Sequence, residues 1–155
     1  MIEIFQCETD SEFSSAVKIT KDYISWLDID LTFQDIDKEL SQFSQIYSPP
    51  GGLFLIAYYC GKLAGGVGLR MFENTRCEMK RLYVYEEFRG ENIGRKLCTT
   101  LINNSISLRY DKMRLDTFEW MKSALELYES LGFRKIEPYR LNPNPSTVYL
   151  ELKLN

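Results

Sequence analysis

Apolar positions divide the first half of the chain into a strand, two helices and a hairpin. Ile2 and Ile4 indicate a short opening strand, and Thr9 followed by Glu12 forms the capping box typical of a helix start. A weaker start signal at Thr32 predicts a second helix. The apolar positions that recur at helical spacing in these two helices are Phe13, Ala16, Val17, Ile24, Leu27, Phe33, Ile36, Leu40 and Phe43.

Two apolar runs follow the SPPGG segment at residues 48–52, which ends the second helix. Residues 53–59 and 63–69 flank Cys60-Gly61-Lys62, which predicts a hairpin with a three-residue loop. The second run contains three glycines, Gly65, Gly66 and Gly68. Glycine weakens a strand and often marks a bulge or the close approach of a backbone or a ligand, so the alternative is a poor strand or a loop.

Strands and helices alternate in the second half of the chain. The predicted elements are a strand at 76–85, a helix carrying Ile93, Leu97, Leu101, Ile102 and Leu108, a strand at 113–118, a helix at 123–131 ended by Gly132, and strands at 133–139 and 146–154. Because strands occur early and late with crossover helices between them, we expect an α/β fold with a mixed sheet and parallel pairing at its centre.

Composition indicates one folded domain over residues 1–155. Apolar residues make up 45% and charged residues 26%, which is close to the globular average and excludes disorder and a coiled coil. The length leaves no room for a second full domain. The 19 basic and 22 acidic side chains give 19 − 22 = −3, so no general basic surface is expected to bind nucleic acid, and a neutral or cationic small partner fits better.

The absence of histidine narrows the chemistry that the chain can perform. It excludes Ser-His-Asp and Cys-His nucleophile systems and imidazole metal ligands, so any acid or base must be Glu, Asp, Tyr, Lys or Cys. The four cysteines, Cys7, Cys60, Cys77 and Cys98, lack C-x-x-C spacing and lie in apolar or strand-like contexts. We interpret them as reduced packing thiols and expect no metal site.

The first residues, MIEIFQCETD, do not place a basic region before an apolar run. No stretch approaches the roughly 18 apolar residues that a membrane span needs. We therefore expect a cytoplasmic enzyme or binding module that makes no membrane contact.

A strand, a glycine turn and a helix start follow one another in CEMKRLYV and FRGENIGRKL. Free N–H groups and the positive end of the dipole at a helix N-terminus bind anions, and Gly90 and Gly94 let an anion approach the main chain. Arg89 and Arg95 would add positive charge. The pattern predicts a phosphate site, with an ordinary strand-to-helix turn as the alternative, because the P-loop and G-x-G-x-x-G patterns are absent.

The run Arg89-Gly90-Glu91-Asn92-Ile93-Gly94 resembles the acyl-CoA-binding motif [QR]-x-x-G-x-[GA] of the GNAT (Gcn5-related) N-acetyltransferase superfamily. Asn92 stands where glycine is usual, and asparagine tolerates a left-handed backbone best after glycine. Downstream, ALELYESLGF resembles the family helix A-x-x-x-Y-x-x-x-G-F and puts Tyr128 where the family keeps a tyrosine beside the CoA sulfur. The looser likeness covers nearly the whole chain and is closest to small bacterial single-domain members.

The resemblance implies the GNAT fold, a central mixed sheet with splayed parallel strands flanked by helices, and acetyl-CoA as the cofactor. It also implies that the backbone of Leu82 and Val84 pairs with the pantetheine arm, which acts as a substitute strand. The cofactor-binding residues that it implies are Leu82, Tyr83, Val84, Arg89, Gly90, Glu91, Asn92, Ile93, Gly94, Arg95, Ala124 and Leu127.

Acetyl transfer to an amine needs an uncharged nucleophile, donors for the developing oxyanion and a proton for the departing thiolate. Glu78 is the candidate base, since strand alternation puts it on one face with Leu82 and Val84. The alternative is a solvated glutamate or one neutralised by Lys80. Tyr128 is the candidate acid, and core packing with a satisfied hydroxyl is its alternative.

The resemblance places the acceptor between residues 26–34 and 139–144. The candidate substrate-binding residues are Phe33, Arg70 and Tyr139. Acidic residues between positions 28 and 35 favour an ammonium substrate but are equally typical of a solvated helix cap. Arg70 and Arg140 would suit a carboxylate.

The sequence therefore predicts an acetyl-CoA-dependent N-acetyltransferase that transfers acetyl directly to a primary amine of a small molecule, without an acyl-enzyme. One alternative is a non-catalytic acyl-CoA-binding or sensor module. A second is an enzyme that acetylates protein N-termini or lysines. A homodimer is compatible with the sequence, which leaves the acceptor and the acyl length open.

Overall fold

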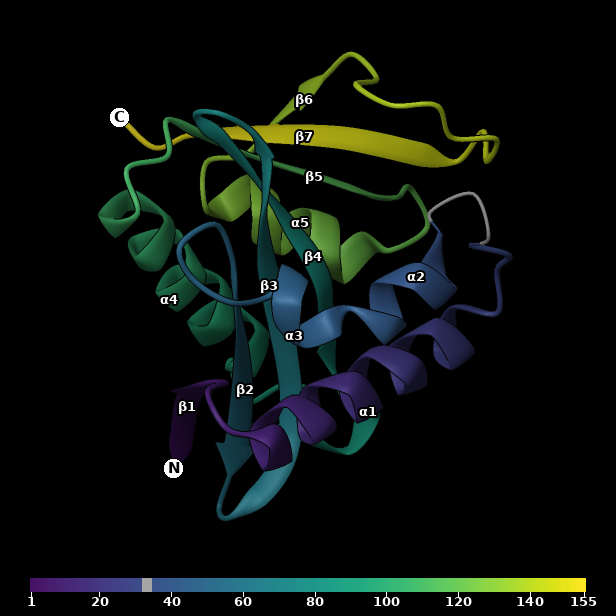
Figure 1. Cartoon of the computed structure of the whole chain (residues 1–155). Coiled ribbons are helices and arrows are strands. Elements are labelled where there is room, and N and C mark those ends of the chain that lie inside the picture. The colour runs from purple at the N-terminus through teal and green to yellow at the C-terminus, as the bar shows by residue number, and fades with distance from the viewer. Residues whose placement is uncertain (32–34) are drawn as a thin grey trace.

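The computed structural model describes residues 1–31 and 35–155 of the chain. Its elements in chain order are β1 Ile2–Gln6, α1 Asp10–Leu27, α2 Ile36–Ser41, α3 Phe43–Ile46, β2 Leu53–Tyr59, β3 Lys62–Glu73, β4 Arg76–Val84, the 3₁₀ turn η2 Glu86–Phe88, α4 Ile93–Ser107, β5 Lys112–Phe118, α5 Lys122–Ser130, β6 Arg134–Ile136 and β7 Thr147–Lys153 (Figure 1).

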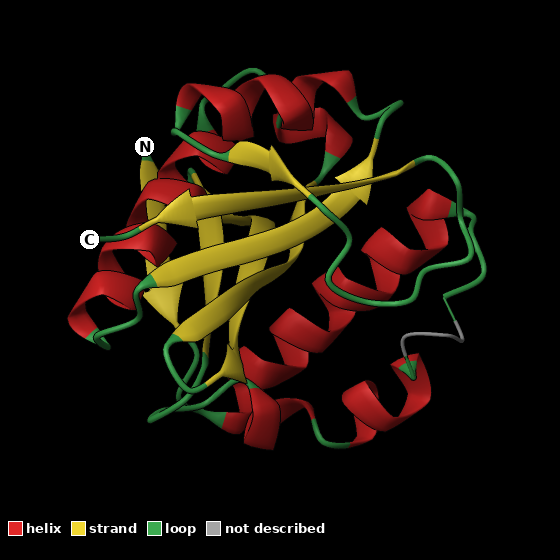
Figure 2. Cartoon of the chain, turned by 90° about the horizontal axis from the view of Figure 1, so that it is seen from above, coloured by secondary structure: helices red, strands yellow, loops and turns green. Residues whose placement is uncertain are grey.

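Within the described residues, the strands form one seven-stranded sheet in the order β1-β2-β3-β4-β5-β7-β6. Neighbouring strands are antiparallel except β4 and β5 at the centre, which run parallel. Helices cover both faces of the sheet (Figure 2). The expected α/β class with a mixed sheet and central parallel pairing is confirmed.

The two faces of the sheet carry separate cores. The larger core lies between the sheet and helices α4 and α5, and includes Leu97, Leu101 and Tyr128. The second lies under α1 and α3, where Ala16 and Phe43 pack on the sheet. Among the described helices, none is long and apolar enough to cross a membrane.

The parallel pair β4 and β5 stays hydrogen-bonded over a short stretch only. Residues 76–78 of β4 pair with residues 112–114 of β5, and no further pairing joins these two strands along their described length. The rest of β4, residues 79–84, therefore leaves backbone groups open towards β5. An open strand edge of this kind can accept an extended ligand in place of a strand.

A β-bulge at Arg81 lies where the two strands separate. Arg81 has a left-handed backbone with φ of 60°, which is uncommon for a residue with a side chain. Between the pairs Gly68–Lys80 and Gly66–Tyr83, β4 carries one residue more than β3. Such an insertion reverses the alternation of side chains beyond it.

The prediction that Glu78 shares a face of the sheet with Leu82 and Val84 is wrong because of this bulge. Leu82 and Val84 pack with Met79 against the core under α4 and α5, so they lie on the face opposite to Glu78. Simple alternation would have put Glu78 with Leu82 and Val84, but the extra residue at Arg81 shifts the register by one. Glu78 instead faces the side of the sheet covered by α1.

Two glycines of β3 allow close contacts that a side chain would prevent. A Cβ at Gly65 would lie 2.4 Å from the carbonyl oxygen of Tyr83, and a Cβ at Gly68 would lie 2.6 Å from the Tyr47 ring. The interpretation of these glycines as marks of bulges and of close backbone approach is confirmed by the register shifts beside them, and the segment is a continuous strand of 12 residues rather than a loop.

Local signals are confirmed at some positions and corrected at others. Thr9 and Glu12 form both hydrogen bonds of the predicted capping box. The β2–β3 connection has two loop residues rather than three, Cys60 and Gly61, both with positive φ. Cys60 is exposed there, whereas the other three cysteines are buried as expected.

Two predicted elements are shorter than their sequence patterns suggest. The predicted second helix divides into α2 and α3 on either side of Gln42. The strand predicted at 133–139 is confined to residues 134–136, because an irregular segment with Asn and Pro follows it. Thr32 and Phe33, which contributed to the predicted helix start, lie outside the described residues.

Candidate active site

A cavity of about 790 Å³ opens where β4 separates from β5. Its walls come from the end of β4, the turn that leads into α4, the first turn of α4, the side of α1 and the start of α5. The residues that line it are Tyr23, Trp26, Leu82, Tyr83, Val84, Phe88, Arg89, Gly90, Asn92, Ile93, Gly94, Arg95, Trp120, Met121, Lys122, Ser123, Ala124, Glu126, Leu127 and Ser130.

One end of the cavity meets the N-terminus of α4. Asn92 takes the left-handed conformation with φ of 63° and ψ of 20°, as expected, and Gly90 has φ of 88°. No side chain caps the first turn of α4 in the described chain, so its N–H groups are available to an anion. Arg95, whose side chain donates to Ser130 Oγ at 2.8 Å, adds positive charge.

The other end of the cavity is aromatic. Trp26 lies with its ring centroid 5.7 Å from that of Tyr83 and 5.9 Å from that of Trp120. The Arg89 guanidinium lies 5.1 Å from the Trp26 ring centroid, and its Nε donates to the Val84 carbonyl oxygen at 3.0 Å. Arg89 therefore contacts the part of β4 that the splay leaves open.

Tyr128 projects from α5 into the core beneath this cavity. The residue is 6% exposed, and its ring packs edge-on against Phe133 with centroids 5.7 Å apart. Burial raises the pKa of Tyr128 well above its usual value, and nearby Cys98, Tyr23 and Asp116 raise it further. The phenol therefore keeps its proton at neutral pH and can act as a donor.

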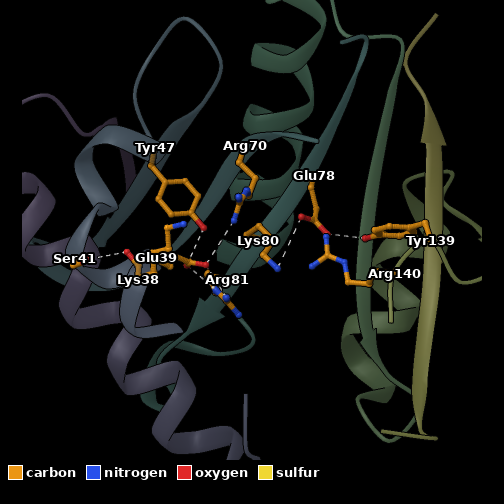
Figure 3. Close-up of polar contacts among 10 residues, drawn as sticks. All are labelled: Lys38, Glu39, Ser41, Tyr47, Arg70, Glu78, Lys80, Arg81, Tyr139 and Arg140. Carbon is orange, nitrogen blue, oxygen red and sulfur yellow. Dashed lines mark hydrogen bonds and ion pairs between the residues drawn. The ribbon is translucent and has the colours of Figure 1, made fainter. Parts of the chain in front are cut away.

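Glu78 lies in a buried ion cluster on the opposite face of the sheet (Figure 3). Its carboxylate pairs with Arg140, accepts a hydrogen bond from the Tyr139 hydroxyl at 2.8 Å, and lies 4.0 Å from Lys80 Nζ. Burial by itself would raise the pKa of Glu78, but the charges of Lys80 and Arg140 and the hydrogen bonds from Arg140 and Tyr139 outweigh it and lower the pKa. Glu78 is therefore ionised at neutral pH.

A second carboxylate, Glu39, anchors α2 to β4 (Figure 3). Arg81 donates to both oxygens of Glu39 at 3.0 Å and 2.9 Å, and Tyr47 donates at 3.0 Å. Arg70 lies 3.9 Å from the same carboxylate. The bulge at Arg81 thus turns a cation from β4 towards α2, and Arg70 belongs to this cluster rather than to that of Glu78.

A smaller cavity of about 30 Å³ lies between the separating strands, on the Glu78 face. Lys80 and Asp116 line it, together with Asn142 and Thr147 from β7 and the loop before it. Tyr23 lines both cavities, so the smaller one adjoins the aromatic end of the larger. The sequence prediction missed Asp116; the signal available was an acidic residue next to Leu115 inside the predicted strand at 113–118.

The structure brings the predicted cofactor residues together with one exception. All of them line the large cavity except Glu91, which accepts a hydrogen bond from the Tyr59 hydroxyl at 3.1 Å. Of the predicted substrate residues, Tyr139 contacts Glu78 and Arg70 contacts Glu39, whereas Phe33 lies outside the described residues. Tyr23 and Trp120 line the cavity but belong to no motif, and only the fold places them there.

Other forms of catalysis find little support in the described residues. They contain no group of three or more side chains suited to hold a metal ion. Burial raises the pKa of Cys7, Cys77 and Cys98 to about 12 in each case, so these thiols stay protonated and are poor nucleophiles. These three buried thiols are therefore poor candidates for an acyl-enzyme.

Comparison with known proteins agrees with the family that the sequence motifs indicate. The model of the acetyltransferase (GNAT) family matches residues 20–133. An uncharacterised N-acetyltransferase of Schizosaccharomyces pombe (strain 972) is 40% identical over 139 residues, which cover 88% of this chain and 85% of that protein.

Solved structures share the fold. A GNAT-family acetyltransferase of Staphylococcus aureus Mu50 superposes with a TM-score of 0.81 at 22% identity, covering 100% of both chains. An N-acetyltransferase of Thermoplasma acidophilum, solved in complex with coenzyme A, has a TM-score of 0.74 at 17% identity over 99% of each chain. The matched motifs, the splayed strands and these likenesses together establish that the chain is an acetyltransferase that belongs to the GNAT family.

Proposed function

We propose that the protein transfers an acetyl group from acetyl-CoA to the primary amine of a small molecule, directly and without an acyl-enzyme. The observation that carries the proposal is the cavity at the splay of β4 and β5, which joins an open strand edge to the uncapped N-terminus of α4. These are the two features that an extended amide-containing arm with a pyrophosphate needs.

The residues of the large cavity fit acetyl-CoA in chemical type. Gly90 and Asn92 hold the turn in which main-chain N–H groups face the cavity, and Arg95 supplies a cation for the pyrophosphate. Val84 offers backbone groups to the pantetheine arm once Arg89 releases its carbonyl oxygen. When bound, acetyl-CoA would supply the activated acetyl group.

Tyr128 is proposed as the acid. In the reaction a C–N bond forms and the C–S bond breaks. The acceptor ammonium loses two protons, the sulfur gains one, and the other passes to solvent. The Tyr128 hydroxyl makes no hydrogen bond with the described residues, and its raised pKa keeps the proton in place until a stronger base, the departing thiolate, needs it.

Glu78 as the base, acting through a water, stays a prediction. Its ionised carboxylate can accept a proton, although the charges of Arg140 and Lys80 that lower its pKa also weaken it as a base. The same contacts suit a positioning role in which Glu78 holds Tyr139 and Arg140. A pH profile separates the two roles, as described below.

The proposal is tested by a thermal-shift titration with acetyl-CoA, CoA, ATP and NAD, followed by thiol release with a panel of amines. At a hundred times its dissociation constant a ligand adds about 2.7 kcal/mol, which raises the melting temperature of a domain of this size by roughly 5–10 °C. We expect a shift with both CoA forms only.

Arg95→Gln should reduce this shift, and Arg109→Gln is the matched control because Arg109 is exposed outside the cavity. Binding of CoA without thiol release from any amine or peptide would instead indicate the sensor module. Thiol release with peptides but not with free amines would indicate a protein acetyltransferase. No shift with either CoA form would overturn the proposal.

A further inference from the structure

The small cavity beside the aromatic end is lined by charges of both signs from two neighbouring strands, Asp116 of β5 and Lys80 and Arg81 of β4. The Arg81 guanidinium is held by both oxygens of Glu39, so the proposal concerns Lys80 and Asp116. Lys80 follows Met79, which faces the α4–α5 core, so Lys80 faces the other side of the sheet. Asp116 follows Leu115, which also faces that core, and therefore lies on the same side as Lys80. Both side chains line the cavity where β4 and β5 separate.

Two polar atoms at this cavity lack hydrogen-bond partners in the described parts of the chain. Asp116 Oδ2 and Thr147 Oγ1 are buried and make no hydrogen bond with any described residue. Lys80, whose side chain is 4% exposed, has its Nζ 4.0 Å from Glu78 as its ion-pair contact. Buried polar groups in folded proteins are normally hydrogen-bonded, so unpaired ones that share a cavity point to a missing ligand.

We propose that this cavity binds the ammonium and carboxylate groups of a free α-amino acid, with the ammonium on Asp116 and the carboxylate on Lys80. The inference rests on the proposed function and names its acceptor class. It adds two residues, Asp116 and Lys80, that neither the motifs nor the family likeness assigns. Thr147 and Asn142 supply neutral hydrogen-bonding groups at the same cavity.

The pairing of charges selects a zwitterion over the simpler alternatives. A plain amine brought to Asp116 would also approach the Lys80 ammonium, and a plain acid brought to Lys80 would approach the Asp116 carboxylate. A molecule that carries both an ammonium and a carboxylate can place the ammonium on Asp116 and the carboxylate on Lys80, so that both of its charges are paired. Burial lowers the pKa of Lys80 to about 8 despite the opposing effect of Glu78, so Lys80 is mostly charged at neutral pH.

The size and position of the cavity agree with this assignment. A volume of about 30 Å³ holds roughly two water-sized groups, which matches an ammonium and one carboxylate oxygen, and leaves the amino acid side chain outside. Tyr23 lines both this cavity and the large one, and the charge of Asp116 raises the pKa of Tyr128. An ammonium on Asp116 is therefore near the proposed acid.

The test compares each amino acid with the amine that remains when its α-carboxylate is removed. Thiol release from acetyl-CoA is measured with the pairs alanine and ethylamine, aspartate and β-alanine, and phenylalanine and phenethylamine. We expect at least one amino acid to be acetylated with kcat/KM about tenfold or more above that of its paired amine, as for loss of a charged hydrogen bond. This comparison needs no variant.

Variants then assign the two charges to residues. Lys80→Met should reduce the preference for the amino acid over its paired amine by about tenfold, mainly through KM. Asp116→Asn should reduce kcat/KM for both members of a pair. Lys112→Met and Asp111→Asn are matched controls at the start of β5, where Lys112 is part-exposed and Asp111 exposed, and both should keep the wild-type preference. The CoA-induced thermal shift verifies that each variant is folded.

The outcomes separate this inference from the proposed function. If wild-type enzyme acetylates the paired amines as well as the amino acids, or if Lys80→Met keeps the full preference, the cavity holds only water and the inference is wrong while the proposed function stands. If neither amino acids nor amines are acetylated although CoA binds, both fail. Amino acid preference lost in Lys80→Met but not in Lys112→Met supports the inference.

Discussion

At the scale of single residues, the environments of Tyr128 and Glu78 push their pKa values in opposite directions. Burial in an apolar core raises the pKa of Tyr128, whereas Arg140 and Lys80 lower that of Glu78. The phenol therefore retains its proton and the carboxylate its charge over the whole physiological range. This is the division expected of a proton donor and an anionic partner.

Replacement of Tyr128 by Phe tests the donor. We expect kcat to fall by about 100-fold or more, as for loss of a general acid, with an unchanged CoA-induced thermal shift. Because an acid must be protonated and burial raises its pKa, alkaline loss of wild-type activity from this group should begin only above about pH 10. Tyr58→Phe, on β2 and outside the lining of the large cavity, is the control; unchanged kcat in Tyr128→Phe would exclude the role.

Replacement of Glu78 by Gln separates a base from a positioning residue. A base matters most when the acceptor amine is protonated, so the ratio of wild-type to variant kcat should grow as the pH falls from about 9 to about 6. A ratio that stays constant with pH, with a change in KM, would assign Glu78 to positioning. Glu73→Gln, a half-exposed residue in an ion pair on β3, provides the control.

At the scale of elements, the bulge at Arg81 has two structural consequences. It reverses the alternation of β4, which directs Leu82 and Val84 to the large cavity, and it brings Arg81 to Glu39 of α2. The ion pair is buried, with both side chains 4% exposed. A helix of six residues gains little stability by itself, so this contact, together with the packing of Ile36 and Leu40, holds α2 in place.

Replacement of Glu39 by Ala should therefore destabilise the protein by about 3–5 kcal/mol, because it leaves the Arg81 cation buried without its partner. Urea unfolding measures the change. Asp37→Ala, an exposed acidic residue on the same helix, should cost less than about 0.5 kcal/mol. Equal, small effects for the two variants would mean that α2 does not depend on the pair.

A further element prediction concerns β3. Gly68→Ala should destabilise the protein by about 1–3 kcal/mol, since the new Cβ would meet the buried Tyr47 ring at 2.6 Å. Tyr47 also holds Glu39, so its displacement should weaken the same cluster. Gly94→Ala is the comparison, because a Cβ there makes only ordinary contacts of 3.6 Å; similar losses for both would contradict the argument.

At the scale of the whole molecule, buried carboxylates link stability to pH. The pKa values of Glu39 and Glu78 are lower in the folded protein than in the unfolded chain. Their contribution is therefore complete above the unfolded value, about 4.3, and is lost as the pH falls through the folded values. We expect the free energy of unfolding to decrease below about pH 4.5, and to decrease less steeply in Glu78→Gln, which urea titrations at several pH values would measure.

Much of the fold could be predicted from the sequence because its signals are local. The capping box at Thr9, the apolar periodicity of α4 and α5, and the left-handed Asn92 after Gly90 depend on residues a few positions apart. The order of these elements, with helices as crossovers, then limited the sheet to a mixed arrangement. The turn that we propose to bind the pyrophosphate of acyl-CoA follows from the same local run, since this turn and the start of α4 are continuous in the chain.

The rest depended on contacts between distant segments. The bulge at Arg81 carries no local signature, because its left-handed backbone is stabilised by Glu39 some forty positions earlier, and it alone decided which face Glu78 occupies. The cavity lined by Lys80 and Asp116 exists because β4 and β5 stop pairing. The end of this pairing depends on both strands together and cannot be recognised in the sequence of one strand. The sequence by itself determined most of the elements and the glycine turn before α4, whereas the tertiary structure decided which charges meet at the small cavity, because only folding brings Lys80 and Asp116 together.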